Sequence, residues 1–407
     1  MSYYKTSELE KFGVSRRTVS NWIEKAKHGR LELALVEAKG KFYIAKTATN
    51  QAAVQKLVGN NRKYINRKSL KTVTPKPEFY ELFQDEHVLG IISNISTYRE
   101  IPLQYTYFDD GAEYWNRHTL QLAEDKRLNP LNSTISLLDA NIGYLDKVLE
   151  DFTYVNVVDV GVGNALPTRK LLEHLLDAGK LKRYAAVDIS RDMLAIAEKN
   201  IGAWFGDRIR FESYVNDISF EPFADVIAEP PDKDAKTTNL VLLLGGTLAN
   251  FRAPEDALKV IRKSMGPNDL FAYGLKLDSP VNREQFDFRI SGAANQSLPP
   301  QCKFMLDLLG IQEDFYTVET GFNEREQARY ARIRLKHALS IDFESPRGPW
   351  RVDLNKDDAL IVWWAKHSTA SDVVELLSAN GFNPLLTSQL PDHDYMLVLA
   401  DLRCDIR

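Results

Sequence analysis

The sequence predicts an α/β protein built around a doubly wound parallel sheet, with a small basic module at its N-terminus. Residues 141–278 alternate between strand-like and helix-like patterns, which is typical of a parallel sheet covered by helices on both faces. The chain has 407 residues, enough for two or three domains. Its charge is unevenly distributed, because residues 1–71 carry 16 Lys and Arg against 5 Asp and Glu, whereas the remainder carries 36 against 51.

Composition and spacing argue against several classes of protein. The longest apolar stretch, Leu240 to Leu248, is too short to span a bilayer, and the first residues lack the apolar segment of a secretory signal. The two cysteines, Cys302 and Cys404, have no Cys or His neighbour at ligand spacing, and the seven histidines are scattered. We therefore expect a cytoplasmic protein without a disulfide scaffold or a metal site.

The basic N-terminal segment, residues 1–71, has the pattern of a small helical module with a hairpin. Ser15 can cap a helix over 16–27, strand-like residues 33–36 and 41–44 flank Lys39-Gly40, and a further helix is expected over 49–58. This order resembles the winged helix-turn-helix of MerR-type and excisionase-type DNA-binding proteins. The resemblance implies double-stranded DNA as a partner, bound by a recognition helix and a basic hairpin. The DNA-contacting residues would be Arg16, Arg17, Ser20, Asn21, Lys39 and Lys41.

Other interpretations of this module stay open. It could dock on the other domains, recognise a leader peptide or a partner protein, or mediate dimerisation. Many MerR-type proteins are dimers, so a homodimer is one expectation, although the usual dimerising helix is not evident. Residues 72–77, with two prolines, have the composition of a linker to the rest of the chain.

The alternating region contains a candidate nucleotide site. Strands are predicted over 154–160, 184–187, 211–217 and 239–244, and Gly161-Val162-Gly163 follows the first of them. Asp159, Asp188 and Asp217 each lie at a strand end, where ligands of such sheets bind, and this pattern suits a nucleoside with a ribose diol. A nicotinamide dinucleotide fits less well, because Leu166 stands where its third glycine is expected. S-adenosylmethionine has no pyrophosphate and fits the shorter turn.

Beyond single motifs, residues 105–402 resemble the histidine-specific Nα-methyltransferases of ergothioneine biosynthesis and their relatives. The segments that carry the resemblance are Tyr107–Trp115, Asp159–Gly163, Val187–Ser190, Leu243–Phe251 and Phe271–Asp278. It implies a class I methyltransferase domain at 141–278. It also implies a second, α+β substrate domain formed by 72–140, linker included, and 279–407. The charged stretch 323–332 within that domain has a helix-like pattern.

The resemblance also implies roles for individual residues. Asp188 would bind the ribose hydroxyls, Asp217 would lie at the adenine, and Asn250 would accept a hydrogen bond from the substrate amine. Asn250 would thereby orient the nitrogen lone pair toward the methyl group, which makes it the candidate catalytic residue. The residues expected at the cofactor, S-adenosylmethionine, are Asp159, Gly161, Gly163, Thr168, Asp188, Ile189, Asp217, Gly245 and Thr247.

Two departures from the family bear on the substrate. A substrate-contacting tyrosine of the family is missing from residues 124–130, and the Glu and Ser that hold the imidazole correspond to Val362 and Trp364. Each hydrogen bond lost by a buried imidazole costs about 1–3 kcal/mol. We therefore expect Val362 and Trp364 at the substrate, and a primary amine other than histidine as the methyl acceptor.

Two functions remain after this reading. The first is an N-methyltransferase for an amino-acid-like or peptide substrate, carrying a DNA-binding module. The second is a DNA-binding transcriptional regulator whose methyltransferase-like domain senses S-adenosylmethionine or a small molecule without turnover. A regulator should bind a discrete DNA site with steep salt dependence, whereas a purely metabolic enzyme should keep its activity without residues 1–71.

Overall fold

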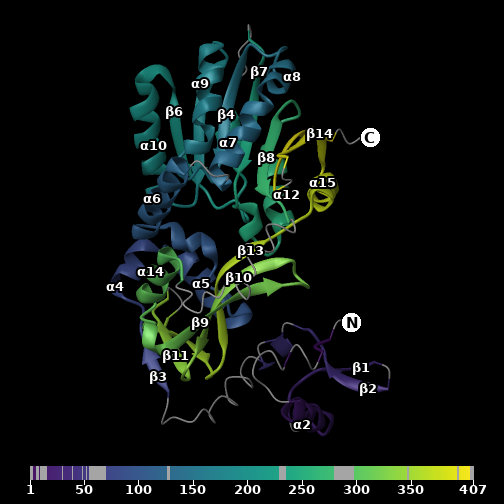
Figure 1. Cartoon of the computed structure of the whole chain (residues 1–407). Coiled ribbons are helices and arrows are strands. Elements are labelled where there is room, and N and C mark those ends of the chain that lie inside the picture. The colour runs from purple at the N-terminus through teal and green to yellow at the C-terminus, as the bar shows by residue number, and fades with distance from the viewer. Residues whose placement is uncertain are drawn as a thin grey trace.

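The chain forms two lobes and a small N-terminal module (Figure 1). The computed structural model describes residues 3–5, 9, 16–29, 31–38, 40–47, 49–51, 53–54, 70–125, 129–228, 235–278, 298–345, 348–391 and 394–403. We call the upper lobe of Figure 1 the sheet lobe (130–278 and 370–402) and the lower one the second lobe (71–107 and 298–366). Helix α6 (Asp110–Glu124) lies between them and packs against helices of both.

Seven strands form the sheet of the sheet lobe, in the order β14-β15-β8-β7-β4-β5-β6. The five strands from β4 to β8 are mutually parallel, β15 is antiparallel to β8, and β14 is antiparallel to β15. The central strands are almost continuously buried, as expected for a sheet covered on both faces. The bounds are β4 Tyr154–Val160, β5 Leu181–Asp188, β6 Phe211–Val215, β7 Thr237–Leu244, β8 Leu270–Lys276, β14 Phe382–Gln389 and β15 Tyr395–Leu402.

The last two strands correct the expected domain boundary. We expected all of 279–407 in the substrate domain, but β14, β15 and the helix α15 (Ala370–Ala379) belong to the sheet lobe. The reason lies in β15, whose residues 395–400 are all buried and pair with β8 inside the sheet. The second lobe therefore takes only the part of this segment up to about residue 366.

Helices cover both faces of the seven-stranded sheet. Successive strand residues point to opposite faces, so Val157 packs into one apolar core and Val158 into the other. The first core lies under α7 (Pro130–Ala140), α8 (Ile142–Val148), α9 (Arg169–Asp177) and α10 (Arg191–Phe205). The second lies under α11 (Ala224–Ile227), α12 (Pro254–Ser264) and α15. Short 3-10 turns are η4 (Leu166–Thr168), η5 (Gly206–Arg208) and η6 (Leu248–Asn250).

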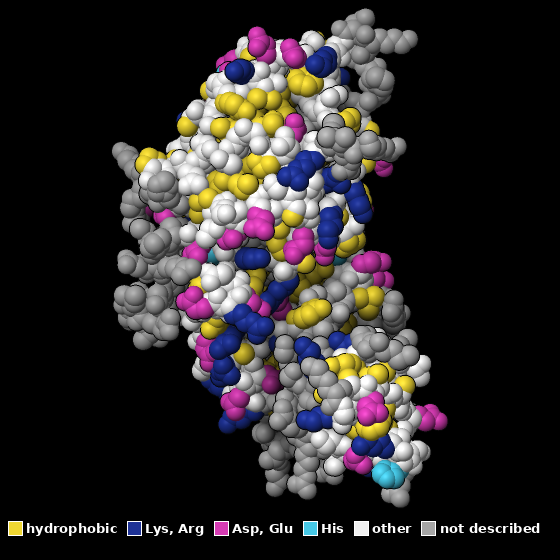
Figure 2. All heavy atoms as spheres, turned by 90° about the vertical axis from the view of Figure 1, so that its right-hand side faces the viewer, with side chains coloured by type: hydrophobic (Ala, Val, Ile, Leu, Met, Phe, Trp, Pro, Cys, Tyr) yellow, Lys and Arg dark blue, Asp and Glu magenta, His cyan; other side chains and the backbone are white. Residues whose placement is uncertain are grey.

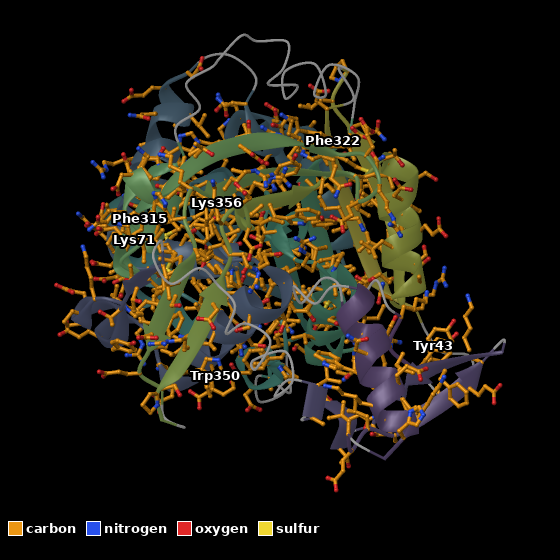
Figure 3. All side chains as sticks on the ribbon, turned by 90° about the horizontal axis from the view of Figure 1, so that it is seen from below. Tyr43, Lys71, Phe315, Phe322, Trp350 and Lys356 are labelled. Atoms are coloured by element: carbon orange, nitrogen blue, oxygen red, sulfur yellow. The ribbon has the colours of Figure 1, made fainter. Side chains whose placement is uncertain are left out.

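In its described residues, the second lobe has two small sheets and three helices around one core. One sheet has the order β13-β10-β9 and the other β12-β11-β3. Lys71 of β3 carries its ammonium over the ring of Phe315, 5.5 Å from its centroid (Figure 3). The strands are β3 Lys71–Val73, β9 Tyr316–Asn323, β10 Ala328–Leu335, β11 Leu339–Phe343, β12 Trp350–Leu354 and β13 Ala359–Lys366. The helices are α4 Pro77–Leu82, α5 Asp85–Tyr98 and α14 Pro300–Leu308, with 3-10 turns η3 Leu103–Tyr107 and η7 Glu313–Phe315.

Two local predictions in this lobe were wrong. Residues 72–77 were expected as a linker, but β3 pairs in parallel with β11, and Pro75 is buried. The charged stretch 323–332 was expected as a helix, but residues 324–327 form the turn between β9 and β10, and residues 328–332 are the first part of β10. Gln327 adopts a positive φ of 49° in that turn, and the following residues bury alternate side chains such as Ile333. Period-two burial outweighed the local helical composition.

The N-terminal module contains the helix α2 (Arg16–Lys27) and an antiparallel hairpin of β1 (Leu35–Ala38) and β2 (Lys41–Ile44). Its small core includes Val19 and Trp22 of the helix and Ile44 of the hairpin. Figure 2 shows the module beside the second lobe, with both basic and acidic side chains on its described surface. Within the described residues, no helix is long and apolar enough to cross a membrane.

Candidate active site

An open cavity of about 240 Å³ lies at the carboxyl ends of the parallel strands, between the sheet and α6. All nine residues that the sequence suggests for the cofactor line this cavity, and so does Asn250. They come from four separate segments of the chain, and the topology brings the ends of β4, β5, β6 and β7 to one edge of the sheet. The nine are Asp159, Gly161, Gly163, Thr168, Asp188, Ile189, Asp217, Gly245 and Thr247.

The turn after β4 forms the floor of the cavity. Gly161 and Gly163 have φ values of +68° and +56°, in the left-handed region where a side chain is strained. A Cβ on Gly161 would lie 2.8 Å from the hydroxyl oxygen of Thr247, which follows β7. A Cβ on Gly163 would lie 3.6 Å from the indole nitrogen of Trp115 on α6. The two glycines therefore allow the turn to lie close to the side chains of Thr247 and Trp115.

Two carboxylates follow the turn along the edge of the sheet. Asp188 accepts a hydrogen bond from the Ser190 backbone N–H at 3.0 Å, and burial raises its pKa to about 6. Asp217 accepts hydrogen bonds from the backbone N–H and the hydroxyl of Ser219, at 2.9 and 2.5 Å. Beside it, the side-chain oxygen of Asn216 is buried and has no partner within the described part of the chain. A ligand rich in donors, such as a nucleoside, fits this set of acceptors.

Asp159 lies deeper, at the end of β4. Its carboxylate accepts a 2.7 Å hydrogen bond from the hydroxyl of Tyr184, which lies 3.3 Å from the hydroxyl of Thr168. Burial raises the pKa of Asp159 to about 7, although the tyrosine hydrogen bond opposes that shift. A buried carboxylate of this kind favours a cationic group in the cavity next to it.

The segment after β7 carries Asn250. Gly245 has a φ of +88°, and its N–H donates to the carbonyl of Gly274 on the neighbouring strand. The chain then forms η6, and the partly buried Asn250 lines the same cavity as the glycine turn. The amide oxygen of Asn250 can accept an amine N–H there.

Val362 and Trp364 do not line the cavity, although the sequence places them at the substrate. Both point to the buried side of β13, where Val362 is 1% exposed within the core of the second lobe. Trp364 is 4% exposed, and the guanidinium of Arg252 lies 3.7 Å from the centroid of its rings. Arg252 in turn donates a 2.7 Å hydrogen bond to the buried Glu100. This strand face is thus filled by the protein's own side chains.

Sequence reasoning missed the other half of the cavity wall. It is lined by helix residues of α6 and α7 and by two residues of η3 that carry no nucleotide-site signal. The available signal was the spacing i, i+3, i+4, i+7 on α6, which marks one face of a helix but not what that face meets. These residues are Gln104, Tyr107, Trp115, His118, Thr119, Leu122, Pro130, Leu131 and Thr134. Tyr107 and Trp115 belong to a segment that carries the family resemblance but had no assigned role, and a surface or packing role was expected for His118 rather than a place at the cavity.

The residues expected at DNA are described only in part. Ser20 and Asn21 on α2 and Lys41 on β2 are exposed on the module. The side chains of Arg16 and Arg17, and the whole of Lys39, lie outside the described residues.

In the large sheet, β15 is antiparallel to both of its neighbours, β14 and β8. This strand order defines a class I S-adenosylmethionine-dependent methyltransferase, together with the glycine turn after β4 and the acids at the ends of β5 and β6. Within that class, residues 85–402 match the family described as histidine-specific methyltransferase, S-adenosylmethionine-dependent, and the chain belongs to this family. S-adenosylmethionine is therefore its cofactor. No curated protein matches the sequence.

Several solved structures are similar to this chain over most of its length. An S-adenosylmethionine-dependent methyltransferase from Clostridium acetobutylicum is 10% identical, with 73% of this chain and 100% of that chain covered and a TM-score of 0.36. Magnesium protoporphyrin IX methyltransferase from Synechocystis is 11% identical, with 74% and 97% covered and a TM-score of 0.40. A didemethyltoxoflavin methyltransferase from Burkholderia thailandensis is 12% identical, with 79% and 92% covered and a TM-score of 0.35.

Proposed function

We propose that this methyltransferase transfers a methyl group to the nitrogen of a primary amine on an amino-acid-like or peptide substrate other than histidine. The observation that carries the proposal is the meeting of two segments in one cavity. The glycine turn after β4, where the cofactor is expected, lies against the loop after β7, which bears Asn250. An amide acceptor beside a methyl donor suits the positioning of an amine.

Different residues of the cavity would bind the cofactor and position the amine. Asp188 and Asp217 would hold the ribose and adenine of S-adenosylmethionine, which supplies an electrophilic methyl group when bound. Asn250 would accept one N–H of the amine and so orient the nitrogen lone pair. The amine must lose its ammonium proton before it can act as a nucleophile.

The exclusion of histidine rests on the buried face of β13. The family's imidazole contacts correspond to Val362 and Trp364, and neither side chain faces the cavity. Arg252 covers Trp364 and is tied to Glu100, so an imidazole at this place would have to displace a partly buried ion pair.

The experiment is a methyl-transfer assay on the full chain with S-adenosylmethionine and a panel of amino acids, amines and peptides, read by mass spectrometry. We expect one or more primary amines, but not histidine, to gain a methyl group. The Asn250→Ala variant should lose most of that activity while it retains S-adenosylhomocysteine binding. Methylation of histidine as the preferred acceptor, or equal activity in the Asn250 variant, would contradict the proposal.

We further propose that residues 1–71 form a winged helix-turn-helix that binds double-stranded DNA. Support comes from the net charge of this segment and from the helix and hairpin that share a core. The test is retention of a random-sequence duplex by the full chain, compared with the double variant Arg16→Ala, Arg17→Ala. We expect the double variant to lose retention and to bind S-adenosylhomocysteine unchanged, because only phosphate and base contacts are removed. Equal retention would overturn the assignment.

The same two assays separate the enzyme from a second function, a DNA-binding transcriptional regulator that senses the cofactor without turnover. The observation that favours this alternative is the filling of the imidazole face by Trp364 and Arg252. Steeply salt-dependent DNA binding together with cofactor binding and no methyl transfer to any amine would select the regulator. The cytoplasmic location and the homodimer stay predictions, to be measured by cell fractionation and sedimentation.

A further inference from the structure

One face of α6 forms a continuous wall of the cavity outside the residues expected at the cofactor. Trp115, His118, Thr119 and Leu122 all line the cavity and follow the spacing i, i+3, i+4, i+7. They therefore form a single stripe along the helix. Gly111, at the start of α6, lies so close to η3 that a Cβ there would be 2.0 Å from the carbonyl oxygen of Thr106. The close packing of α6 against η3 therefore requires glycine at this position.

A second helix, α7, contributes Pro130, Leu131 and Thr134 to the lining of the same cavity. The two threonines on these walls are already satisfied. Thr119 donates its hydroxyl to the Trp115 carbonyl at 2.9 Å, and Thr134 donates to the Pro130 carbonyl at 2.8 Å. Each hydroxyl hydrogen is thus used within its own helix. The part of the cavity that α6 and α7 line, which we call the space between α6 and α7, carries apolar side chains such as Leu122 and Leu131 together with the rings of Trp115 and His118.

Aromatic rings dominate one end of this space. Trp115 packs edge-on against Tyr107, with ring centroids 5.6 Å apart, and lies 5.8 Å from the ring of His118. The ring of His118 also lies nearly parallel to that of Tyr114, with an interplanar angle of 4° and centroids 6.3 Å apart. Burial lowers the pKa of His118, so the imidazole is neutral near pH 7 and one ring nitrogen is an acceptor.

We propose that the space between α6 and α7 is the subsite for the body of the methyl acceptor, and that it takes a flat aromatic ring bearing an N–H or O–H donor. The ring would stack on Trp115, and its donor would bond to His118. This inference rests on the proposed amine methyltransferase function and names the substrate class of that site. It differs from the positions at which the family holds the imidazole, because the corresponding residues, Val362 and Trp364, do not line the cavity.

Calorimetric titration of the full chain saturated with S-adenosylhomocysteine tests the subsite, with tryptamine and 1-methyltryptamine as probes. Tryptamine carries a ring N–H, whereas in 1-methyltryptamine a methyl group replaces that hydrogen and the donor is lost. We expect the wild type to bind tryptamine about three- to tenfold more tightly than 1-methyltryptamine, the range of one net hydrogen bond. The His118→Phe variant should lose this preference. Trp115→Leu should weaken both probes about tenfold, because the stacking face is removed.

Leu120→Ala is the matched control, since Leu120 is on α6 but 46% exposed and outside the cavity. It should bind both probes as the wild type does. A second variant, Leu122→Trp, adds bulk between the helices and should block tryptamine while S-adenosylhomocysteine still binds. This variant decides the matter if Trp115→Leu fails to fold.

The outcomes separate this inference from the proposed function. Absence of tryptamine binding to the wild-type complex, or equal binding by the His118, Trp115 and Leu122 variants, overturns the subsite even if amines are methylated elsewhere in the cavity. Binding with the expected pattern of losses supports the subsite. If that pattern holds and no amine is ever methylated, the cavity binds the aromatic ring as described, but the ring is not that of a methyl acceptor and the methyl-transfer proposal fails.

Discussion

The two halves of the cavity are built in different ways. The half in which we propose that the cofactor binds, called the cofactor half, consists of backbone turns and carboxylates at the ends of consecutive parallel strands, such as Gly161 after β4 and Asp188 at the end of β5. The other half consists of side chains from the faces of α6 and α7, such as Trp115 and Leu131. The first half is tied to strand order and to glycine at particular φ values. The second depends only on which helix faces pack over the sheet.

This difference teaches that the two halves should respond differently to substitution. A change in the cofactor half alters groups that no neighbour can replace, because each has a defined place at the sheet edge. A change in the helical half alters packing and shape, so it should affect the acceptor more than the cofactor. The predictions below run from the largest expected effect to the smallest.

Asp188→Ala should produce the largest loss. The two charge-assisted hydrogen bonds that Asp188 is proposed to make to the ribose diol would be lost, so S-adenosylhomocysteine should bind about 100-fold or more weakly in calorimetry. The fold should persist, because the side chain of Asp188 is partly exposed. The pKa of Asp188 is also raised, which means that the surrounding protein does not stabilise its charged form. If the variant binds S-adenosylhomocysteine almost as tightly as the wild type, the cofactor does not bind at this edge of the sheet.

Gly161→Ala should weaken S-adenosylhomocysteine binding about tenfold, because the new Cβ meets the Thr247 hydroxyl at the floor of the cavity. Gly179→Ala is the matched control. Gly179 has the same φ of +68° but open space around it. Both variants should lose about 1–2 kcal/mol in the free energy of unfolding, since alanine is strained at that φ. Equal loss of affinity in both would show that strain, not the contact, matters.

Asp159 should make stability depend on pH. Its pKa is about 7 in the fold and near 3.8 when unfolded, so the folded state binds the proton more tightly. Its stabilising effect is therefore present below about pH 4 and is lost as the pH rises toward 7. Thermal unfolding of the Asp159→Asn variant should lack this loss, so its Tm relative to wild type should be higher at pH 8 than at pH 4. A pH-independent difference in Tm would contradict this.

Thr134→Val should have the smallest effect on the cofactor. The hydroxyl of Thr134 already donates to the Pro130 carbonyl, so the variant keeps the shape of the wall and loses one bond within α7. S-adenosylhomocysteine affinity should change by less than about twofold, and the free energy of unfolding by about 1 kcal/mol or less. A large loss of affinity would place the cofactor between α6 and α7 and erase the distinction between the two halves.

The cofactor half was open to prediction because its signals are local. Glycines after a buried strand and an acid at the end of the next strand can be found without knowledge of packing, and every residue chosen this way lines the cavity. The helical half was not, because the stripe on α6 has the spacing of any helix that buries one face. His118 illustrates this, since its place next to Trp115 depends on how α6 packs over the turn at Gly163.

Two other expectations from the sequence failed because they depended on contacts between distant segments. Val362 and Trp364 matched family positions in the sequence, but the pleat of β13 directs both side chains into the interior. The strand β15 was expected in the second lobe, yet its buried stretch pairs with β8 in the large sheet. Pairing between segments more than 100 residues apart leaves no local pattern in either segment.

The sequence by itself determined the alternation of strands and helices in the sheet lobe, the glycine turn, the acids at the strand ends and the separation of the basic module by charge. These features follow from burial periods, backbone φ preferences and charge, which act over short stretches of chain. Only the tertiary structure decided that α6 and α7 enclose the cavity, that Arg252 covers Trp364, and that the last strands return to the sheet. Those outcomes depend on contacts between distant segments, whose energies arise only once the chain has packed.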